Sequence, residues 1–168
     1  FSMYLPYDIK LPNVKDTREF FNPPIPYIFP SIVQVICRNT ISSNDIMRAC
    51  QPIYGLYTQI FQSILYLISI YFYLKIFKNI RNDKKLLDFS LLIFVSILVV
   101  NYKTFSMIRG EPYIIFFNSI ILYRFYKLCS NSFLYKKKDI VIFGLLIGFL
   151  ALSRQWAFLL FPAYFLFT

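Results

Sequence analysis

The sequence predicts an all-α fold: a polytopic bundle of transmembrane helices with an extracytoplasmic Pro-rich loop and interfacial helices. Of the 168 residues, 58% are hydrophobic and 21% are aromatic, which is typical of membrane proteins. The apolar residues form long blocks rather than a stripe along one helical face. Lysines and arginines gather at the ends of these blocks, as they do at the cytoplasmic ends of membrane spans. Together these observations favour a membrane bundle over a water-soluble domain.

Residues 1–50 form the first predicted unit, because they hold most of the prolines and half of the acidic side chains. We expect an extracytoplasmic loop with interfacial helices. The apolar stretch at residues 27–36 is too short to cross a bilayer and contains Pro30, which we expect to interrupt it. We therefore predict that this stretch lies along the membrane, at a large angle to the later spans. A further helix should begin near Ile46, behind a polar N-cap.

Residues 51–168 form the second predicted unit, a transmembrane bundle of four to five spans. A helix needs about 20 apolar residues to cross a bilayer. The expected spans are residues 57–77, 86–102, 113–128, 140–156 and 157–168 onward. The short segment Ser153-Arg-Gln-Trp156, which contains three polar residues, divides the last apolar run. This run forms either one long tilted helix or two limbs joined at an outer corner, and we favour the corner.

The net charge of +10 does not indicate a nucleic-acid-binding protein, because the cations lie at the ends of apolar runs. Two clusters, within residues 75–85 and 124–138, should be cytoplasmic by the positive-inside rule. This topology places the Pro-rich segment, the connection at residues 106–113 and Arg154 on the extracytoplasmic face. We expect a multi-pass integral protein of a cell inner membrane or the endoplasmic reticulum, in contact with membrane lipid and not with nucleic acid.

The connection at residues 106–113 carries Arg109 and Glu111 just before Pro112. Proline favours the first turn of a helix, so Glu111 should lie at or just before an N-cap, beside the membrane surface. Arg109 can bind a phosphate through two hydrogen bonds, and Glu111 can orient a hydroxyl or a metal ion. The alternative is an interface anchor combined with a helix cap.

Arg154 and the N-terminal carboxylates are the other candidate site residues. A guanidinium near the membrane is costly unless it meets water, a lipid headgroup or a carboxylate. Arg154 therefore either snorkels to the interface or binds a phosphate, and we expect it to converge with Arg109 and Glu111 on one cavity. Asp8 and Asp16 are candidate catalytic carboxylates in the outer loop, or are merely solvated.

The cysteines do not have the spacing of metal ligands, and the chain has no histidine. Cys37 and Cys50 pair as a disulfide if their loop is extracytoplasmic, or remain as two free thiols. Gly144 and Gly148 match the small-xxx-small pattern of packed membrane helices. The chain starts with Phe and its last apolar run has no polar flank, so we interpret it as an internal piece of a longer protein.

Three stretches follow a known pattern. Glu19-Phe-Phe-Asn-Pro-Pro-Ile-Pro-Tyr27 has the form His-Pro-Pro-Leu-Pro-Tyr, with Asn22 in place of the His. Ile108-Arg-Gly-Glu-Pro-Tyr-Ile-Ile-Phe-Phe117 resembles an Arg-x-x-Asp stretch that opens a membrane helix. Phe143-Gly-Leu-Leu-Ile-Gly-Phe-Leu-Ala-Leu-Ser-Arg154, followed by Leu159-Leu-Phe-Pro-Ala163, is similar to Gly-x-x-x-Gly-x-x-x-Leu-Thr-Lys/Arg…Leu-x-Pro-Ala. In this order they resemble the GT-C glycosyltransferases of the protein O-mannosyltransferase and aminoarabinose transferase type.

The resemblance implies a hexosyl- or pentosyltransferase that takes a sugar from a polyprenyl-phosphate donor on the extracytoplasmic or lumenal face. The acceptor would be a glycan, a lipid or a protein. A carboxylate of the first outer loop would act as base or position a divalent cation such as Mg²⁺ or Mn²⁺, and basic residues such as Arg109 and Arg154 would bind the lipid phosphate. The family's catalytic aspartate corresponds to Asp8 or to a residue before Phe1.

Two other classes of function remain open. A transporter or channel fragment would place charged residues in mid-span, whereas the mid-span polar residues here are uncharged. These residues are Gln59, Gln62, Ser69, Ser96 and Asn118. A non-catalytic membrane scaffold is the second alternative, and it would tolerate the loss of Glu111.

Overall fold

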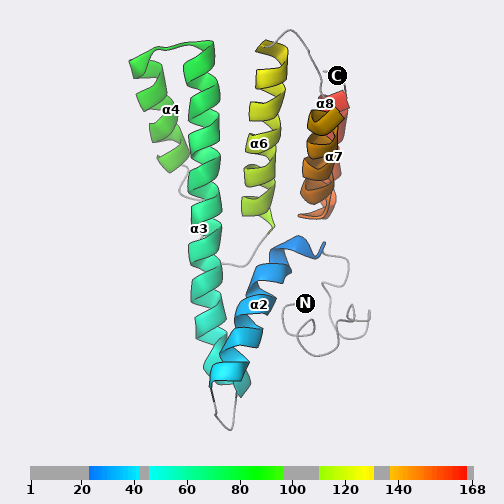
Figure 1. The fold of residues 1–168 in the computed structure, drawn as a ribbon. Helices are drawn as coiled ribbons and strands as arrows, with labels where there is room; N and C mark the ends of the chain where they lie inside the picture. Colours follow the sequence, from blue (N-terminus) through cyan, green and yellow to red (C-terminus); the bar gives the residue numbers. More distant parts are fainter. Residues whose placement is uncertain (1–22, 42–45, 97–109, 131–136, 166–168) are drawn as a thin grey trace.

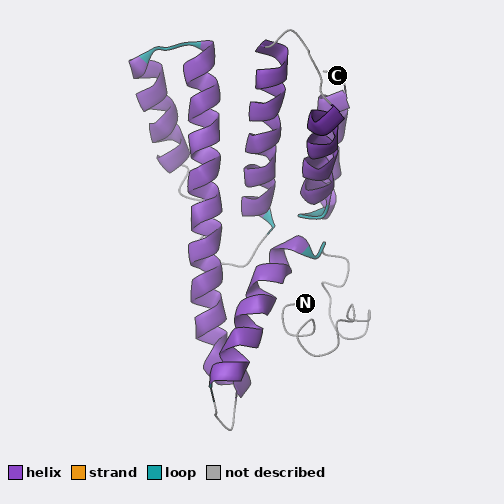
Figure 2. Ribbon diagram, viewed as in Figure 1, coloured by secondary structure: helices purple, strands orange, loops and turns teal. Residues whose placement is uncertain are grey.

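The computed structural model describes residues 23–41, 46–96, 110–130 and 137–165 (Figure 1). These residues are helical and contain no strand (Figure 2), so the predicted all-α class is confirmed. The elements are α2 (Ile25–Thr40), α3 (Ile46–Ile80), α4 (Lys84–Ser96), α6 (Glu111–Ser130), α7 (Lys137–Ala151), the 3-10 helix η1 (Gln155–Leu160) and α8 (Phe161–Phe165).

The longest helix, α3, organises the fold. Its 35 residues extend about 52 Å at roughly 1.5 Å per residue, well beyond the ~30 Å hydrocarbon core of a bilayer. Helix α6 packs on one side of α3 and α4 on the other, and α7 packs against the far side of α6 (Figure 1). The expected span at residues 57–77 therefore lies within a longer helix. That helix begins at Ile46, where the sequence predicted a helix start.

Helix α2 packs on the N-terminal half of α3. The ring of Phe29 stacks on Phe61, and Cys37 is disulfide-bonded to Cys50, so the two helices run antiparallel. Pro30 lies inside α2 without interrupting it, because packing against α3 stabilises a helix that an interior proline disfavours. The expected interruption is therefore wrong. The stretch predicted to lie along the membrane packs against α3, and its orientation relative to a membrane stays a prediction.

The helix pairs are joined by aromatic contacts and by a partly buried polar cluster. Phe72 contacts Tyr123 between α3 and α6, and Phe117 stacks on Phe149 between α6 and α7. Asn118 of α6 donates to the hydroxyl of Tyr73 at 2.7 Å and accepts a hydrogen bond from the hydroxyl of Tyr164. This cluster connects α3, α6 and α8.

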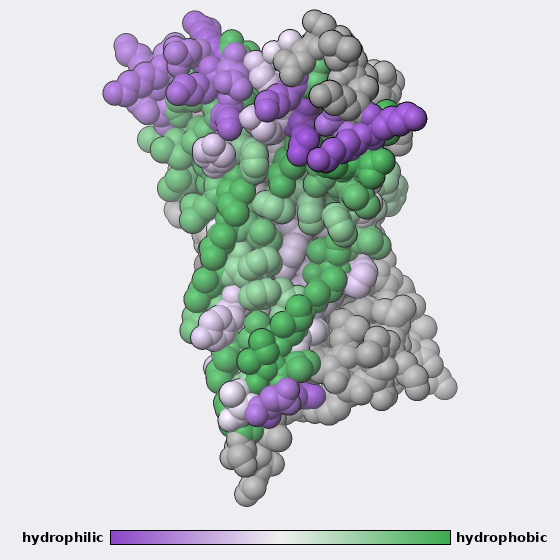
Figure 3. Space-filling view, in the orientation of Figure 1, coloured by the Kyte–Doolittle hydropathy of each residue, from purple (hydrophilic) through white to green (hydrophobic). Residues whose placement is uncertain are grey.

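The packing leaves polar groups inside and large apolar groups outside. The side chains of Gln34, Thr58 and Gln62 are buried, whereas Leu67 and Leu92 are 64% and 62% exposed. Figure 3 shows a broad apolar surface beneath one polar end. Among the described residues, one helical segment, Ala49–Ile80, has the length and hydropathy of a membrane span, and only 28% of its apolar window is buried. The finer expectation of four to five spans stays a prediction.

The last apolar run forms a corner. Helix α7 ends at Ala151, and Arg154 has an extended backbone, with φ −163° and ψ 148°, before η1 begins. The alternative of one long tilted helix is therefore wrong. A Cβ added at Gly144 or Gly148 would meet no atom of another described helix within 4 Å, so the expected helix packing at these glycines stays a prediction.

Candidate functional site

The structure describes two of the residues predicted to form the site, Glu111 and Arg154. Arg109, Asp8 and Asp16 lie outside the described residues. Glu111 is the first residue of α6, and the carbonyl of Gly110 accepts a hydrogen bond from the Ile114 amide at 3.1 Å. A carboxylate in the first turn is favourable because it faces the positive end of the helix dipole. The predicted helix start at Pro112 is correct to within one residue.

Arg154 and Glu111 form an ion pair. Arg154 Nη1 lies 2.7 Å from Glu111 Oε1, and the two side chains are 33% and 29% exposed. Glu111 and Arg154 therefore lie together, although they come from separate turns of the chain. The expected convergence of both with Arg109 on one cavity stays a prediction. Both charges are only partly solvated, and each one lowers the cost of desolvating the other. Their predicted functional roles stay predictions.

Gly110 fixes the approach of the two turns. A Cβ at this position would lie 2.4 Å from the carbonyl oxygen of Ser153 and 3.4 Å from Cγ of Pro26. The start of α2 reaches the same place, since the Ile25 amide lies 3.4 Å from the Leu152 carbonyl oxygen. Three segments far apart in sequence therefore meet around the ion pair, and only a residue without a side chain fits between them.

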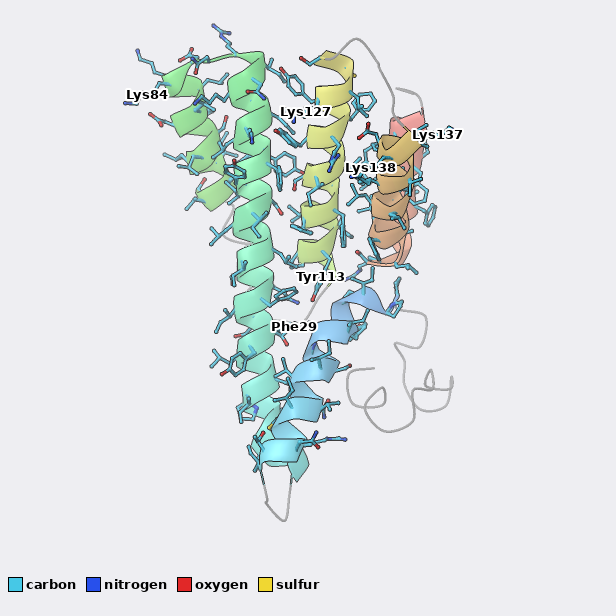
Figure 4. All side chains as sticks on the ribbon, viewed as in Figure 1. Phe29, Lys84, Tyr113, Lys127, Lys137 and Lys138 are labelled. Atoms are coloured by element: carbon cyan, nitrogen blue, oxygen red, sulfur yellow. A yellow bond between two sulfur atoms is a disulfide. The ribbon has the colours of Figure 1, made fainter. Side chains whose placement is uncertain are left out.

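An apolar groove of about 360 Å³ lies next to this junction. Helices α2, α3, α6 and α7 line it with Ile25, Ile28, Phe29, Ile32, Phe61, Leu65, Tyr113, Phe116, Phe117 and Phe149. Figure 4 shows Phe29 and Tyr113 at the end of α6 that carries Glu111. The sequence analysis missed this groove. The dense aromatic residues around Phe61 and Phe117 were its only signal, and they do not reveal which helices meet.

Tyr113 of α6 lines the groove. It is 5% exposed, and its hydroxyl is buried without a hydrogen-bond partner among the described residues. A buried hydroxyl without a partner is costly, so a ligand polar group that reached it would be favoured. Tyr113 was not predicted as a site residue. No local pattern in the sequence points to it.

The lysines lie at the opposite end of the bundle. Lys84, Lys127, Lys137 and Lys138 occupy the end where α3 passes to α4 and α6 to α7 (Figure 4). The Glu111–Arg154 pair lies at the other ends of α6 and α7. Among the described residues, lysines thus lie at one end of the bundle and the Glu111–Arg154 pair lies at the other.

The comparisons with known proteins add no relative. No protein-family model, curated protein or solved structure matches the chain. In the part of the chain that the structure describes, no group of three or more His, Cys, Asp or Glu side chains could hold a metal ion. Glu111 pairs with Arg154, Asp8 and Asp16 lie outside the described residues, and the expected divalent cation stays a prediction.

The disulfide settles the open question about the cysteines. Cys37 and Cys50 are bonded, whereas Cys129 is a free thiol. The bond joins the end of α2 to the beginning of α3 and so closes the loop between them. Disulfides persist in oxidising compartments.

Proposed function

We propose that this chain is part of a membrane glycosyltransferase that moves a sugar from a polyprenyl-phosphate donor to an acceptor on the extracytoplasmic or lumenal face. The observation that carries the proposal is the Glu111–Arg154 pair at the edge of an apolar groove. A lipid-linked sugar combines the same two features, a long apolar chain and a phosphate. The resemblance to the GT-C enzymes supplies the reaction type.

Membrane placement is supported by the apolar exterior and by the charge distribution. A helix with a mostly exposed apolar window does not suit a water-soluble core. The positive-inside rule assigns the lysine-rich end to the cytoplasm, so the ion pair belongs to the outer face. The Cys37–Cys50 disulfide supports the same orientation, since an oxidising compartment lies on that side of the membrane.

In this proposal the isoprenoid chain lies in the groove and the donor phosphate accepts hydrogen bonds from Arg154. The acceptor hydroxyl attacks the anomeric carbon, the bond from that carbon to the phosphate oxygen breaks, and polyprenyl phosphate leaves. A carboxylate takes the proton of the acceptor hydroxyl. Glu111, Asp8 and Asp16 are the candidates for this base. Glu111 also orients the guanidinium of Arg154.

A non-catalytic scaffold is the second candidate, and the short ion pair itself favours it. Glu111 neutralises Arg154 directly, so the pair could simply join the corner to α6. Charge reversal distinguishes the two functions. In the variant Glu111→Arg/Arg154→Glu a structural pair is restored, but the cation is displaced from the place where the donor phosphate would bind.

The test uses the full-length protein in membranes and a panel of synthetic polyprenyl-phosphate sugars. We expect Arg154→Gln to weaken donor binding and Glu111→Gln to lower turnover, each about thirty-fold or more, which corresponds to about 2–5 kcal/mol for a lost charged partner. The reversed pair should fold and remain inactive. The matched control is Arg124→Gln, because Arg124 pairs with Asp139 at 3.7 Å near the opposite ends of α6 and α7, and it should leave transfer unchanged.

Two results would contradict the proposal. Full transfer by the reversed pair would reduce Glu111 and Arg154 to a structural contact. Absence of transfer by the wild-type protein from every donor would favour the scaffold.

A further inference from the structure

A second cavity lies between α3 and α4, at the lysine-rich end of the molecule. Its volume is about 430 Å³. The two helices form a hairpin, because α3 ends at Ile80 and α4 starts at Lys84, and Asp83 Oδ1 accepts a hydrogen bond from the Lys85 amide at 3.0 Å. None of the residues that line this cavity belongs to the Glu111–Arg154 site.

Two lysines of α3 line the cavity from the same face. Lys75 and Lys78 are three residues apart, so their side chains are neighbours on the helix surface. The ammonium of Lys75 contacts two aromatic side chains: it lies 3.3 Å from the hydroxyl of Tyr71, and 5.4 and 5.1 Å from the ring centroids of Tyr71 and of Tyr123 in α6. Such contacts with aromatic rings restrict a lysine side chain and leave its remaining protons available to an anion.

The apolar part of the cavity comes from leucines. Leu74 of α3 and Leu87 and Leu91 of α4 line it together with the lysines. Leu87 and Leu91 are four residues apart and so share one face of α4. The cavity also contains the carboxylate of Asp88 and the amide of Asn79. Two lysines against one aspartate leave a net positive charge directly beside an apolar surface.

We propose that this cavity binds the headgroup of an anionic phospholipid from the cytoplasmic leaflet. The phosphate lies between Lys75 and Lys78, and the first part of an acyl chain covers Leu87 and Leu91. The end of the molecule that carries the α3–α4 turn is polar above a broad apolar surface (Figures 1 and 3), which matches the boundary at which phospholipid phosphates lie. A free phosphate would use the lysines but not the leucines, so we assign the cavity to a lipid.

This inference is independent of sugar transfer. It requires only that α3 crosses a membrane with its lysine end in the cytoplasm. Basic residues beside a span attract anionic lipids, and the cavity between α3 and α4 gives that attraction a defined place. The donor site proposed above lies at the other end of the bundle, so loss of one function leaves the other measurable.

The experiment measures binding of phosphatidylglycerol to the delipidated full-length protein in neutral detergent, by native mass spectrometry. We expect Lys75→Gln/Lys78→Gln to weaken binding about thirty-fold, which is equivalent to about 2 kcal/mol. Asp88→Asn should strengthen binding several-fold, because it removes the negative charge from the cavity. The Asp88→Asn variant keeps both lysines, so its stronger lipid binding tests the proposal even if the double lysine variant fails to fold.

The matched control is Lys137→Gln/Lys138→Gln, which removes the same charge from the same end of the molecule but outside the cavity (Figure 4). It should change binding less than three-fold, on the order of 0.6 kcal/mol. Equal losses in the two double variants, or no loss in either, would overturn the proposal. Equal binding of phosphatidylcholine would overturn the headgroup assignment. Displacement of the lipid by an equal concentration of glycerol 3-phosphate would show a site for a free phosphate.

Discussion

The ring of Phe29 in α2 stacks on the ring of Phe61 in α3, with centroids 4.1 Å apart and planes inclined by 11°. Phe61 also contacts Tyr113 of α6, with centroids 6.2 Å apart. The three rings therefore join α2, α3 and α6 beside the apolar groove. Through this contact, helix α2 becomes one wall of the candidate site.

The stacking predicts an energetic coupling between α2 and α3. Phe29→Ala and Phe61→Ala should each lower the melting temperature, and a double-mutant cycle should give a coupling of about 0.5–1.5 kcal/mol, the usual range for an aromatic pair. Ile36→Ala is the control, since Ile36 is 60% exposed on the same helix. Additive effects of the two Phe variants would contradict this packing.

The topology can be measured with single cysteines in a Cys129→Ser background. A cysteine at Asn82, in the turn between α3 and α4, should resist a membrane-impermeant thiol reagent in intact cells. One at Thr104 should react, because we place the segment before α6 on the opposite face. The reverse pattern would put the Glu111–Arg154 pair in the cytoplasm and remove the basis for extracytoplasmic sugar transfer.

The disulfide should contribute to stability. Cys37 and Cys50 are separated by 13 positions, and closing a loop of about this length stabilises the folded state by about 3 kcal/mol. Cys37→Ser, Cys50→Ser and the double variant should therefore lower thermal stability by similar amounts. Peptide mapping under non-reducing conditions should recover the linked pair from the wild type. A double variant as stable as the wild type would contradict a structural role for this bond.

Gly110 should not accept even one added methyl group. The Cβ of Gly110→Ala would lie 2.4 Å from the carbonyl oxygen of Ser153, so the corner has to move, at a cost of about 1–3 kcal/mol for an overpacked site. Gly144→Ala is the matched control, because its Cβ meets nothing within 4 Å. There the helix should gain up to about 1 kcal/mol from the better propensity of alanine. Equal thermal stability of the two variants would be inconsistent with the close approach at Gly110.

The sequence predicted the local features of the fold better than the contacts between its parts. The helix starts near Ile46 and Pro112 and the break before Gln155 follow from prolines and polar groups, whose effects act within a few residues. The pairing of α2 with α3 depends on Phe29 reaching Phe61, and no local pattern identifies such a partner. Pro30 was misjudged because tertiary packing stabilises a helix that local propensity disfavours.

The candidate site was predictable in part. A carboxylate near Pro112 and an arginine near a corner were both predicted to lie at the outer ends of helices, and this placement brings Glu111 and Arg154 together. The sequence could not supply Gly110 or Tyr113. Their importance comes from a backbone approach and from a buried hydroxyl, which exist only once three distant segments have met.

The uninterrupted course of α3 restricts how this part of the chain can change in length. Cys50 bonds to α2, the Tyr66 hydroxyl donates to the Phe94 carbonyl of α4, and the Tyr73 hydroxyl accepts from Asn118 of α6. Each residue added to an α-helix rotates everything beyond it by about 100°. A single insertion between these contacts would therefore turn one set of partners away from the other. The helix can vary by substitution, whereas insertions and deletions belong in the turn that follows Ile80.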